Sequence, residues 1–399
     1  MAVLRPFKAW RPKAEFVEEI ISVPYDIIET EEARVLAGDN EYSFLRVVRP
    51  EINLPASTSI YSDEVYESGA KTLTKFLHSD KFTQEVESAI YVYQLIWNNK
   101  TITGLFGCVS VEDYDWGVIL KHENTRPDKE DDRTKHLIAQ KAHAEPVMMT
   151  FETNEELQQI IEQTTTTEPI FDLIDEQNVG HRIWKMESNP TGRASTLFED
   201  ITHLYIADGH HRCASASRAA KEVDLYEYPE ARFFPAVLFP FDEVNILAYN
   251  RIIYHIPDDF LKKLRSTFDL KTTENPKPDN PGTICIYLDG KWYKTDLPQS
   301  KSASIESQLD VARLQEFILE PLLGISDQRT DKNISFVGGI HGTDKLEELV
   351  NRQEAQMAIS LYPTSIHELV NISDAGALMP PKSTWFEPKL KSGFLIHTF

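Results

Sequence analysis

Short apolar runs alternate along the chain with longer segments of helical periodicity. The runs are rich in β-branched and aromatic residues and are bounded by Gly, Pro, Asn or Asp, as strands usually are; they span 88–97, 103–111, 231–241, 282–290 and 357–363. Apolar residues recur at helical spacing over 62–80, 127–144, 310–324 and 343–356. The pattern predicts a mixed protein with both α-helices and β-strands.

Turn and capping residues refine this pattern. The stretch Asn98–Lys100 between two apolar runs is typical of a short hairpin loop, so at least part of the sheet should be antiparallel. A purely doubly wound fold is therefore disfavoured. Ser365 and Glu368 have the spacing of a capping box, and Gly376 suits the position just past the end of that helix.

The length of 399 residues suits two domains or one large domain. The irregular stretches 161–170 and 271–283 could each form a seam, but neither resembles a long flexible linker. We expect a phosphate-binding catalytic region over 1–245 and a C-terminal α/β region over 246–399 that completes the site.

Composition limits the setting in which the protein works. No run approaches the ~18 apolar residues of a membrane span, and residues 1–13 lack the apolar core of a signal peptide. Cys108, Cys213 and Cys285 are widely spaced and odd in number, which argues against a disulfide framework and a paired-cysteine metal site. These features favour a soluble, cytoplasmic protein without a membrane partner.

The chain is strongly acidic, with 63 Asp and Glu against 41 Lys and Arg and a formal charge of −22. A field of that sign repels a phosphate backbone, so nucleic acid is not expected as the main partner. A local basic cluster can still hold one phosphorylated metabolite inside an acidic body.

The stretch 203–223, HLYIADGHHRCASASRAAKEV, contains such a cluster. Residues 204–207 are typical of the end of a buried strand, Asp208 and Gly209 of a tight turn, and the small residues that follow of a closely packed helix. Unpaired N–H groups and the dipole at a helix start favour an anion, and Gly209 lets backbone approach it. We therefore expect a phosphate site here.

The polar side chains of this stretch suit the same chemistry. Arg212 would grip two phosphate oxygens, while His210 and His211 donate hydrogen bonds or exchange protons. Asp208 would be repelled by phosphate unless a metal ion bridges them, which indicates Mg²⁺ with a nucleotide. In the alternative, Asp208 only caps the helix, and His211 and Arg212 are structural partners. Adjacent helix residues point about 100° apart, so His210 and His211 are not expected to share one zinc ion.

Three further clusters are candidates. In 121–133, Glu123 suits a base that deprotonates a substrate hydroxyl, and Lys121 or Arg126 suits a phosphate ligand. This segment could equally be a solvated loop before an acid-capped helix.

Tyr25 and Asp26 follow Pro24 and are our candidate substrate-binding residues. Asp26 would bind a substrate amine or a metal ion, and the alternative is a purely structural turn. Lys382, after two prolines, is a plausible anion ligand or part of a charged tail loop. The chain has no GxxxxGK[ST], GxGxxG or GxSxG motif.

Six motifs in this order resemble those of the bacterial and archaeal domain of unknown function family 1015, over nearly the whole chain: RPFKAW, SVPYDII, KHENTRP, ADGHHR, EPLLGI and MPPKSTWFEPK. The box DGHHR also resembles the phosphate box of sulfiredoxin, the ParB nucleotide domain and the free serine kinases. That resemblance implies an α/β (α+β) fold of mixed, partly antiparallel sheets with packed helices around a ParB/sulfiredoxin-like core. Where sulfiredoxin carries its reactive cysteine this chain has His210, and ParB binds DNA, which the charge disfavours.

The resemblance to free serine kinases implies phosphoryl transfer from ATP or ADP to free L-serine, giving O-phosphoserine. Gly209, His210, His211 and Arg212 would then cradle the donor phosphates, with Mg²⁺ near Asp208. Glu123 as proton acceptor and Asp26 as ligand of the serine amine are our own assignments. Two rivals remain: a phosphatase acting on phosphoserine or a similar phosphoester, and a nucleotide-sensing module without turnover. The sequence leaves the oligomeric state open.

Overall fold

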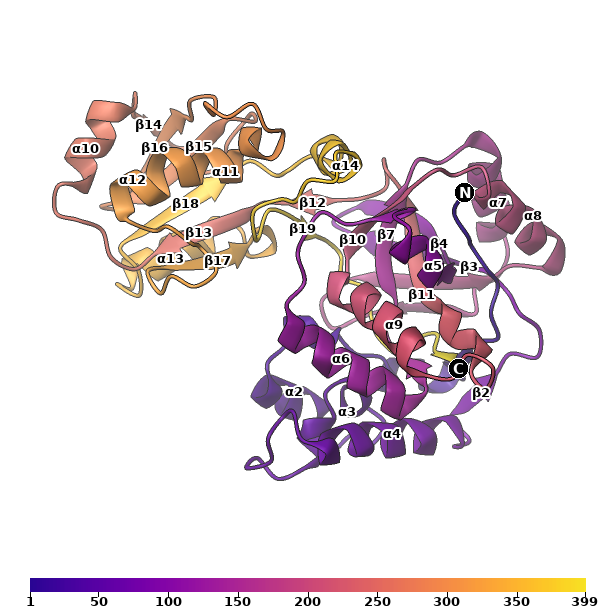
Figure 1. Cartoon of the computed structure of the whole chain (residues 1–399). Helices are drawn as coiled ribbons and strands as arrows, with labels where there is room; N and C mark the ends of the chain where they lie inside the picture. Colours follow the sequence, from indigo (N-terminus) through magenta and orange to yellow (C-terminus); the bar gives the residue numbers. More distant parts are fainter. The chain divides into compact units, whose positions relative to one another are not determined.

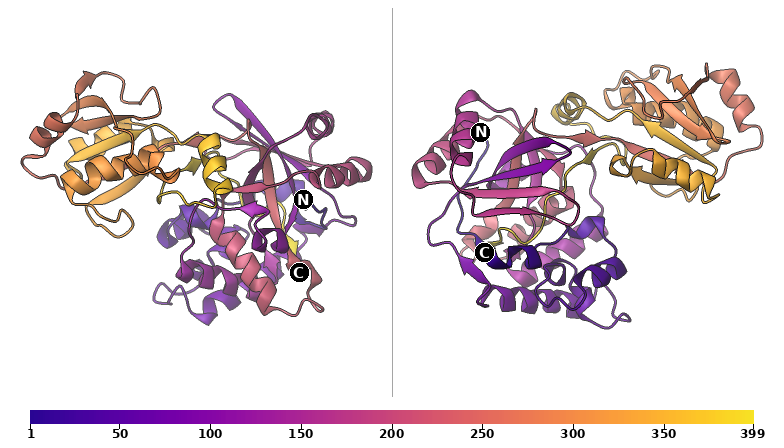
Figure 2. Two further views of the ribbon diagram at one scale, coloured as in Figure 1. Left: turned by 45° about the horizontal axis from the view of Figure 1, so that its top comes forward. Right: turned by 180° about the vertical axis from the view of Figure 1, so that it is seen from behind.

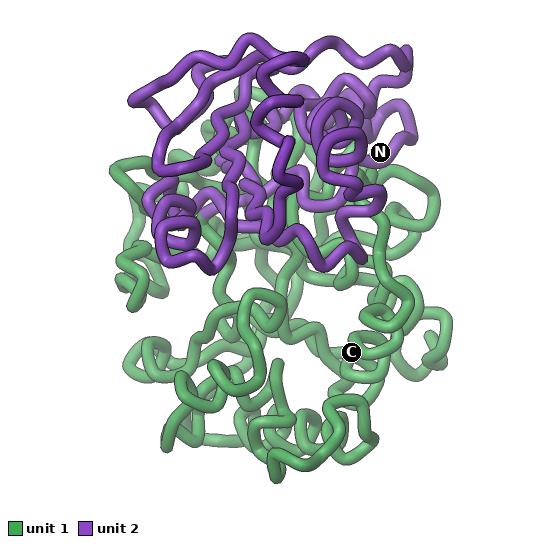
Figure 3. The backbone as a smooth tube through the Cα atoms, turned by 90° about the vertical axis from the view of Figure 1, so that its left-hand side faces the viewer, with its two compact units in different colours: residues 1–244, 388–399 green, residues 245–387 purple.

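A computed structural model describes residues 1–399 and divides the chain into two compact units (Figure 3). Unit 1 contains Met1–Val244 and Pro388–Phe399, and unit 2 contains Asn245–Glu387. The last segment of the chain thus belongs to unit 1. The predicted division at residue 245 had assigned that segment to the C-terminal region. The catalytic and completing roles assigned to the two parts of the chain stay predictions.

Unit 1 is built on an eight-stranded mixed sheet in the order β5-β10-β7-β11-β4-β3-β9-β8 (Figure 1). β5 with β10 and β7 with β11 pair in parallel, and the other neighbours are antiparallel. The strands are β3 (Tyr91–Trp97), β4 (Lys100–Ser110), β5 (Ile119–Leu120), β7 (Val147–Phe151), β8 (Phe171–Ile174), β9 (Gly180–Lys185), β10 (Leu204–Asp208) and β11 (Phe233–Pro240). The predicted hairpin is β3–β4, whose turn residues Asn98 and Asn99 both have positive φ, as a two-residue hairpin turn requires.

Helices α2, α3, α4, α6 and α9 gather beside one part of this sheet, and α7 with α8 beside another (Figures 1 and 2). The helices are α1 (Val17–Ile20), α2 (Thr30–Ala37), α3 (Leu45–Val48), α4 (Asp63–Leu77), α5 (Val111–Asp115), α6 (Pro127–Gln140), α7 (Glu155–Thr165), α8 (Ser188–Phe198) and α9 (His210–Glu222). Short 3₁₀ turns are η1 (Ala14–Phe16), η2 (Tyr25–Ile27), η3 (Pro50–Asn53) and η4 (Pro229–Arg232). α9 packs on α6 through its small residues, since the Ser215 hydroxyl donates to the Glu130 carbonyl at 3.2 Å. No helix has the length and apolar character needed to cross a membrane.

Unit 2 is a six-stranded antiparallel sheet in the order β14-β16-β15-β18-β13-β17. Its strands are β13 (Tyr249–Ile253), β14 (Lys271–Thr273), β15 (Thr283–Leu288), β16 (Lys291–Asp296), β17 (Ile334–Gly338) and β18 (Met357–Leu361), with a separate pair of β12 (Ile246–Leu247) and β19 (Trp385–Phe386). Its helices are α10 (Phe260–Thr267), α11 (Asp310–Leu314), α12 (Glu320–Leu323), α13 (Asp344–Asn351) and α14 (Ile366–Asp374), with 3₁₀ turns η5 (Glu306–Gln308) and η7 (Gly339–His341). The capping box of Ser365 and Glu368 is present. The prediction of a mixed fold with partly antiparallel sheets is confirmed.

The helix predicted over 310–324 is interrupted. A π-helical turn, η6 (Gln315–Leu319), separates α11 from α12. Pro321 has no N–H to donate to the carbonyl four residues earlier, so a regular α-helix cannot continue through this segment.

The C-terminal segment is tied into unit 1 by pairing and by a buried ionic contact. Isolated bridges join Trp10 to Ile396 and Ser22 to Ser392. The small pairs β1 (Trp10–Pro12) with β2 (Phe82–Gln84) and β6 (Ala142–His143) with β20 (His397–Thr398) complete this region. The Lys391 ammonium lies 2.8 Å from the Asp175 carboxylate, with side chains only 3% and 1% exposed.

Asp175 also accepts from His181, whose Nε2 lies 3.2 Å away, and from the backbone N–H of Val179 at 2.8 Å. Burial alone would raise the Asp175 pKa, but His181 and Lys391 hold it below its ordinary value. The stabilisation is therefore present above the unfolded value of ~3.9 and is lost only as the pH falls below it.

We expect Asp175→Asn to lower the free energy of unfolding by ~3 kcal/mol, because it removes the buried counter-charge of Lys391 and leaves the ammonium only the exposed Glu176 carboxylate, 2.9 Å away. The control is Asp172→Asn on the same hairpin, whose pair with Arg182 is about half exposed and is worth at most ~1 kcal/mol. Urea unfolding of both variants measures the difference. Equal losses would show that the buried pair contributes no more than the surface pair.

Candidate functional site

The candidate site lies where two parallel strands end side by side. Leu204 pairs with Ile119 and Tyr205 with Leu120, so the carboxyl ends of β10 and β5 share one edge of the sheet. From this edge the chain enters the 121–126 loop after β5 and helix α9 after β10. Ligands of α/β sheets usually bind at such carboxyl ends.

The start of α9 has the geometry of an anion-binding helix terminus. Gly209 is the N-cap residue, with φ of 101° in the left-handed region, and no side chain caps the helix. Asp208 is the last residue of β10, so the alternative in which Asp208 caps the helix is wrong. The first N–H groups of this 13-residue helix have no intrahelical partners and carry the positive end of its dipole.

The two adjacent histidines point to different neighbours. The ring of His210 is buried and packs edge-on against His122, with centroids 4.5 Å apart, and the His122 backbone N–H lies 3.5 Å from His210 Nε2. His211 Nε2 instead accepts from the backbone N–H of Arg126 at 3.0 Å. Burial lowers the pKa of His210 and of His211, and lowers that of His122 to about 4, so these rings are neutral at pH 7.

The loop after β5 brings a carboxylate to these rings. One ligand atom each from His122, Glu123 and His210 lies within 4.8 Å of the others. Lys121 is exposed nearby in sequence, and the exposed Arg126 donates two hydrogen bonds to the Asp128 carboxylate, at 3.1 and 2.8 Å. A surface pair of this kind is weak, so it can exchange partners.

Arg212 does not face an open cradle. Its Nη2 donates to the carboxylates of Asp26 at 3.2 Å and Asp208 at 3.1 Å, and its Nη1 donates to the carbonyl of Pro146. Burial would lower the Arg212 pKa, but Asp26 and Asp208 raise it above its ordinary value. The expected fork that grips two phosphate oxygens is therefore engaged by carboxylates, because a buried guanidinium must be paired. Its Nε is buried without a hydrogen-bond partner.

Asp208 is held by two cations. Lys389 Nζ lies 3.3 Å from Oδ1, and Arg212 Nη2 lies 3.1 Å from Oδ2. Burial would raise the Asp208 pKa, but Lys389 and Arg212 lower it to about 2. Because both oxygens already contact cationic side chains, the residues present do not fit a resident Mg²⁺ ion on Asp208. Sequence reasoning missed Lys389, although it ends one of the quoted motifs, because its partner is 181 positions away.

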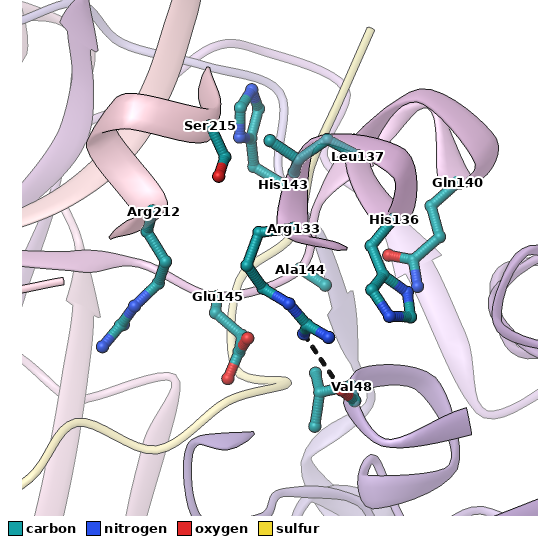
Figure 4. Close-up of a pocket in the computed structure, with 10 residues that line it drawn as sticks. All are labelled: Val48, Arg133, His136, Leu137, Gln140, His143, Ala144, Glu145, Arg212 and Ser215. Atoms are coloured by element: carbon teal, nitrogen blue, oxygen red, sulfur yellow. Dashed lines mark hydrogen bonds between the residues drawn. The ribbon is translucent and has the colours of Figure 1, made fainter. Parts of the chain in front are cut away.

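A small cavity lined partly by charged side chains lies beside Arg212, between α6 and α9 (Figure 4). Its volume is about 40 Å³, and Glu145 stands between the guanidinium groups of Arg133 and Arg212. Burial raises the Glu145 pKa even though Arg212 works against the shift. A carboxyl group with a shifted pKa in a cavity marks a candidate functional residue. No local pattern in the sequence indicated Glu145.

Tyr25 contributes to this network through its ring and its backbone. The ring is buried beneath Arg133, whose Cζ lies 4.1 Å from the ring centroid, and the Tyr25 N–H donates to Glu145 at 3.0 Å. The side chain of Asp26, next in the chain, is 33% exposed. Asp26 is therefore the more accessible of the two residues predicted to bind substrate.

Lys382 belongs to unit 2. It has a positive φ of 58°, its ammonium lies 5.1 Å from the centroid of the Tyr249 ring, and its carbonyl accepts from the fully buried Arg251. Its predicted role in phosphate binding stays a prediction.

Residues 4–312 match the family model described as protein of unknown function (DUF1015). The chain belongs to this family. No curated protein matches the DUF1015 chain.

Several solved structures are similar to the DUF1015 chain at low identity. A free serine kinase in complex with AMP shares 10% identity with a TM-score of 0.39, covering 73% of this chain and 91% of that chain. SbnI with a C-terminal truncation, from Staphylococcus aureus, shares 12% identity with a TM-score of 0.39, over 73% and 87% of the two chains. A conserved hypothetical protein from Pyrococcus furiosus shares 11% identity with a TM-score of 0.36, over 72% and 95%. These values assign no activity, and the ParB/sulfiredoxin-like core stays a prediction.

We expect Gly209→Ala to destabilise the DUF1015 chain more than Gly117→Ala. Both glycines have positive φ, which costs another residue ~1–2 kcal/mol. A Cβ at 209 would also lie 3.1 Å from Arg212 Nε and 3.2 Å from its Cζ, whereas a Cβ at 117 meets nothing within 4 Å. Displacing the buried guanidinium should add at least ~1 kcal/mol. Denaturant unfolding measures the difference. Equal losses in the free energy of unfolding would show that Arg212 can move aside without destabilising the protein.

Proposed function

We propose that the protein is a nucleotide-dependent phosphotransferase acting on the hydroxyl group of a small molecule, with free L-serine as the first candidate acceptor. The observation that carries the proposal is the start of α9. An uncapped helix terminus with a left-handed glycine lies at the shared end of two parallel strands, next to a half-buried carboxylate, Glu123.

The donor phosphates bind at the first N–H groups of α9, where the helix dipole favours negative charge. His210 and His211 border this position and offer imidazole groups for further hydrogen bonds. Lys121 and Arg126 are exposed on the adjoining loop and can turn toward an oxyanion. Arg212 acts from below by holding Asp208 and Asp26 in place.

The acceptor hydroxyl gives its proton to Glu123, and the accessible carboxylate of Asp26 binds the serine amine. Tyr25 supports Asp26 through its packing, because its own side chain is buried. Phosphoryl transfer depends mostly on positioning and on stabilisation of charge, which these dispersed groups can supply. Mg²⁺ would arrive bound to the nucleotide as part of that substrate.

We expect Glu123→Gln to lower kcat by ~10²–10⁴-fold with little change in the KM for nucleotide, because a general base acts on the chemical step. The test screens ATP and ADP against free amino acids and detects the phosphorylated product by mass. Glu112→Gln, an exposed acid on α5, is the control and should keep full activity.

Two results would overturn this assignment. Release of phosphate from phosphoserine without nucleotide would identify a phosphatase. A thermal shift with nucleotide that survives Glu123→Gln, with no product from any acceptor, would identify a binding module without turnover.

We expect Lys389→Met to raise the KM for nucleotide about tenfold with a smaller effect on kcat. Removing the Lys389 ammonium leaves the Asp208 carboxylate with more negative charge, which repels the phosphates of the nucleotide. The repulsion between two unit charges ~10 Å apart in a partly buried site is ~1–2 kcal/mol. Lys221→Met on the exposed face of α9 is the control. Equal KM values for both variants would remove Lys389 from the site.

A further inference from the structure

Two histidines and one glutamate converge beside the start of α9. His122 and Glu123 follow β5 and His210 follows β10, so the parallel pairing of these strands brings them together. One ligand atom from each lies within 4.8 Å of the other two. His122 and His210 are buried, at 2% and 8% exposure, and Glu123 is half-buried.

Neighbouring backbone groups position the two rings. The His122 backbone N–H lies 3.5 Å from His210 Nε2, at the long end of hydrogen-bond distances, so an ion bound by this nitrogen displaces only a weak contact. His122 makes a hydrogen bond with the backbone of Ile206, and contacts of this kind orient the ring of a metal-binding histidine.

We propose that His122, Glu123 and His210 form a binding site for one divalent transition-metal ion, with Zn²⁺ as the reference ion. Two imidazoles and a carboxylate favour Zn²⁺, Fe²⁺ or Mn²⁺ over Mg²⁺, which prefers oxygen ligands. Bonds of ~2.0–2.2 Å to one ion place the ligand atoms ~3.4 Å apart. Small side-chain rotations close the present separations of up to 4.8 Å.

This site does not include Asp208, whose two oxygens contact Lys389 and Arg212 and do not fit a resident Mg²⁺ ion. Its three protein ligands leave at least one coordination position open, as in catalytic rather than structural zinc sites. Binding of the ion does not depend on the proposed phosphoryl transfer. An ion held there engages the Glu123 oxygen that accepts the hydroxyl proton in that proposal, so saturating Zn²⁺ should inhibit the transfer.

The test uses the full chain after metal removal by a chelator, without nucleotide. Calorimetric titration should show one equivalent of Zn²⁺, not displaced by millimolar Mg²⁺. His210→Ala and Glu123→Gln should each weaken Zn²⁺ binding at least tenfold. His203→Ala, which removes a histidine from the opposite end of β10, should leave it unchanged. Circular dichroism confirms that each variant is folded.

Co²⁺ bound to the unaltered chain gives an independent readout, since its visible absorption reports a low-coordinate site with nitrogen ligands. This measurement decides the matter even where a buried histidine variant fails to fold. Absence of stoichiometric Zn²⁺ binding, or Zn²⁺ binding unaffected by Glu123→Gln, would overturn the proposal. Neither result depends on whether phosphoryl transfer is observed, so the two proposals fail separately.

Discussion

The candidate site depends on the parallel pairing of β5 with β10. This pairing joins residues 85 positions apart, such as Ile119 and Leu204, so that the residues following each strand emerge at one edge of the sheet. Because parallel strands run in the same direction, the loop with Glu123 and the first turn of α9 must then lie together. An antiparallel pairing would have placed one of them at the far end of the sheet.

The ionic contacts around Asp208 determine how the start of α9 can be used. A carboxylate next to a helix terminus would normally accept from its N–H groups and neutralise its dipole. Here Arg212 and Lys389 hold both oxygens of Asp208, and no side chain caps the helix. The same ion pairs offset the desolvation of the buried Arg212 guanidinium. The amide groups at the start of α9 are thereby left without a side-chain cap, which is the condition that our proposal requires.

The sequence predicted features that depend on neighbouring residues. The end of β10, the left-handed Gly209 and the start of α9 follow from local turn chemistry, as does the β3–β4 hairpin. Among the partners of Arg212, Asp208 lies four residues away, whereas Asp26 comes from η2 and Pro146 from the segment before β7. Lys389 comes from the last segment of the chain. The long-range contacts are fixed by tertiary packing, which no window of sequence contains. Arg212 therefore looked like a phosphate ligand, although burial gives it carboxylate partners.

The phosphate site that we propose in this acidic protein depends on short-range interactions. The buried cations are already matched, since Arg212 pairs with Asp26 and Asp208, and Arg133 with Asp132. These ion pairs carry little net positive charge, so they cannot attract a distant anion to a protein whose formal charge is −22. In the proposed site, attraction comes from the helix dipole, whose effect falls off within the first turn, from backbone N–H groups and imidazoles, and from the exposed Lys121 and Arg126 nearby. A site of this kind would select its ligand by contact geometry, which is why we propose one small phosphorylated ligand and not an extended polyanion that an acidic surface repels.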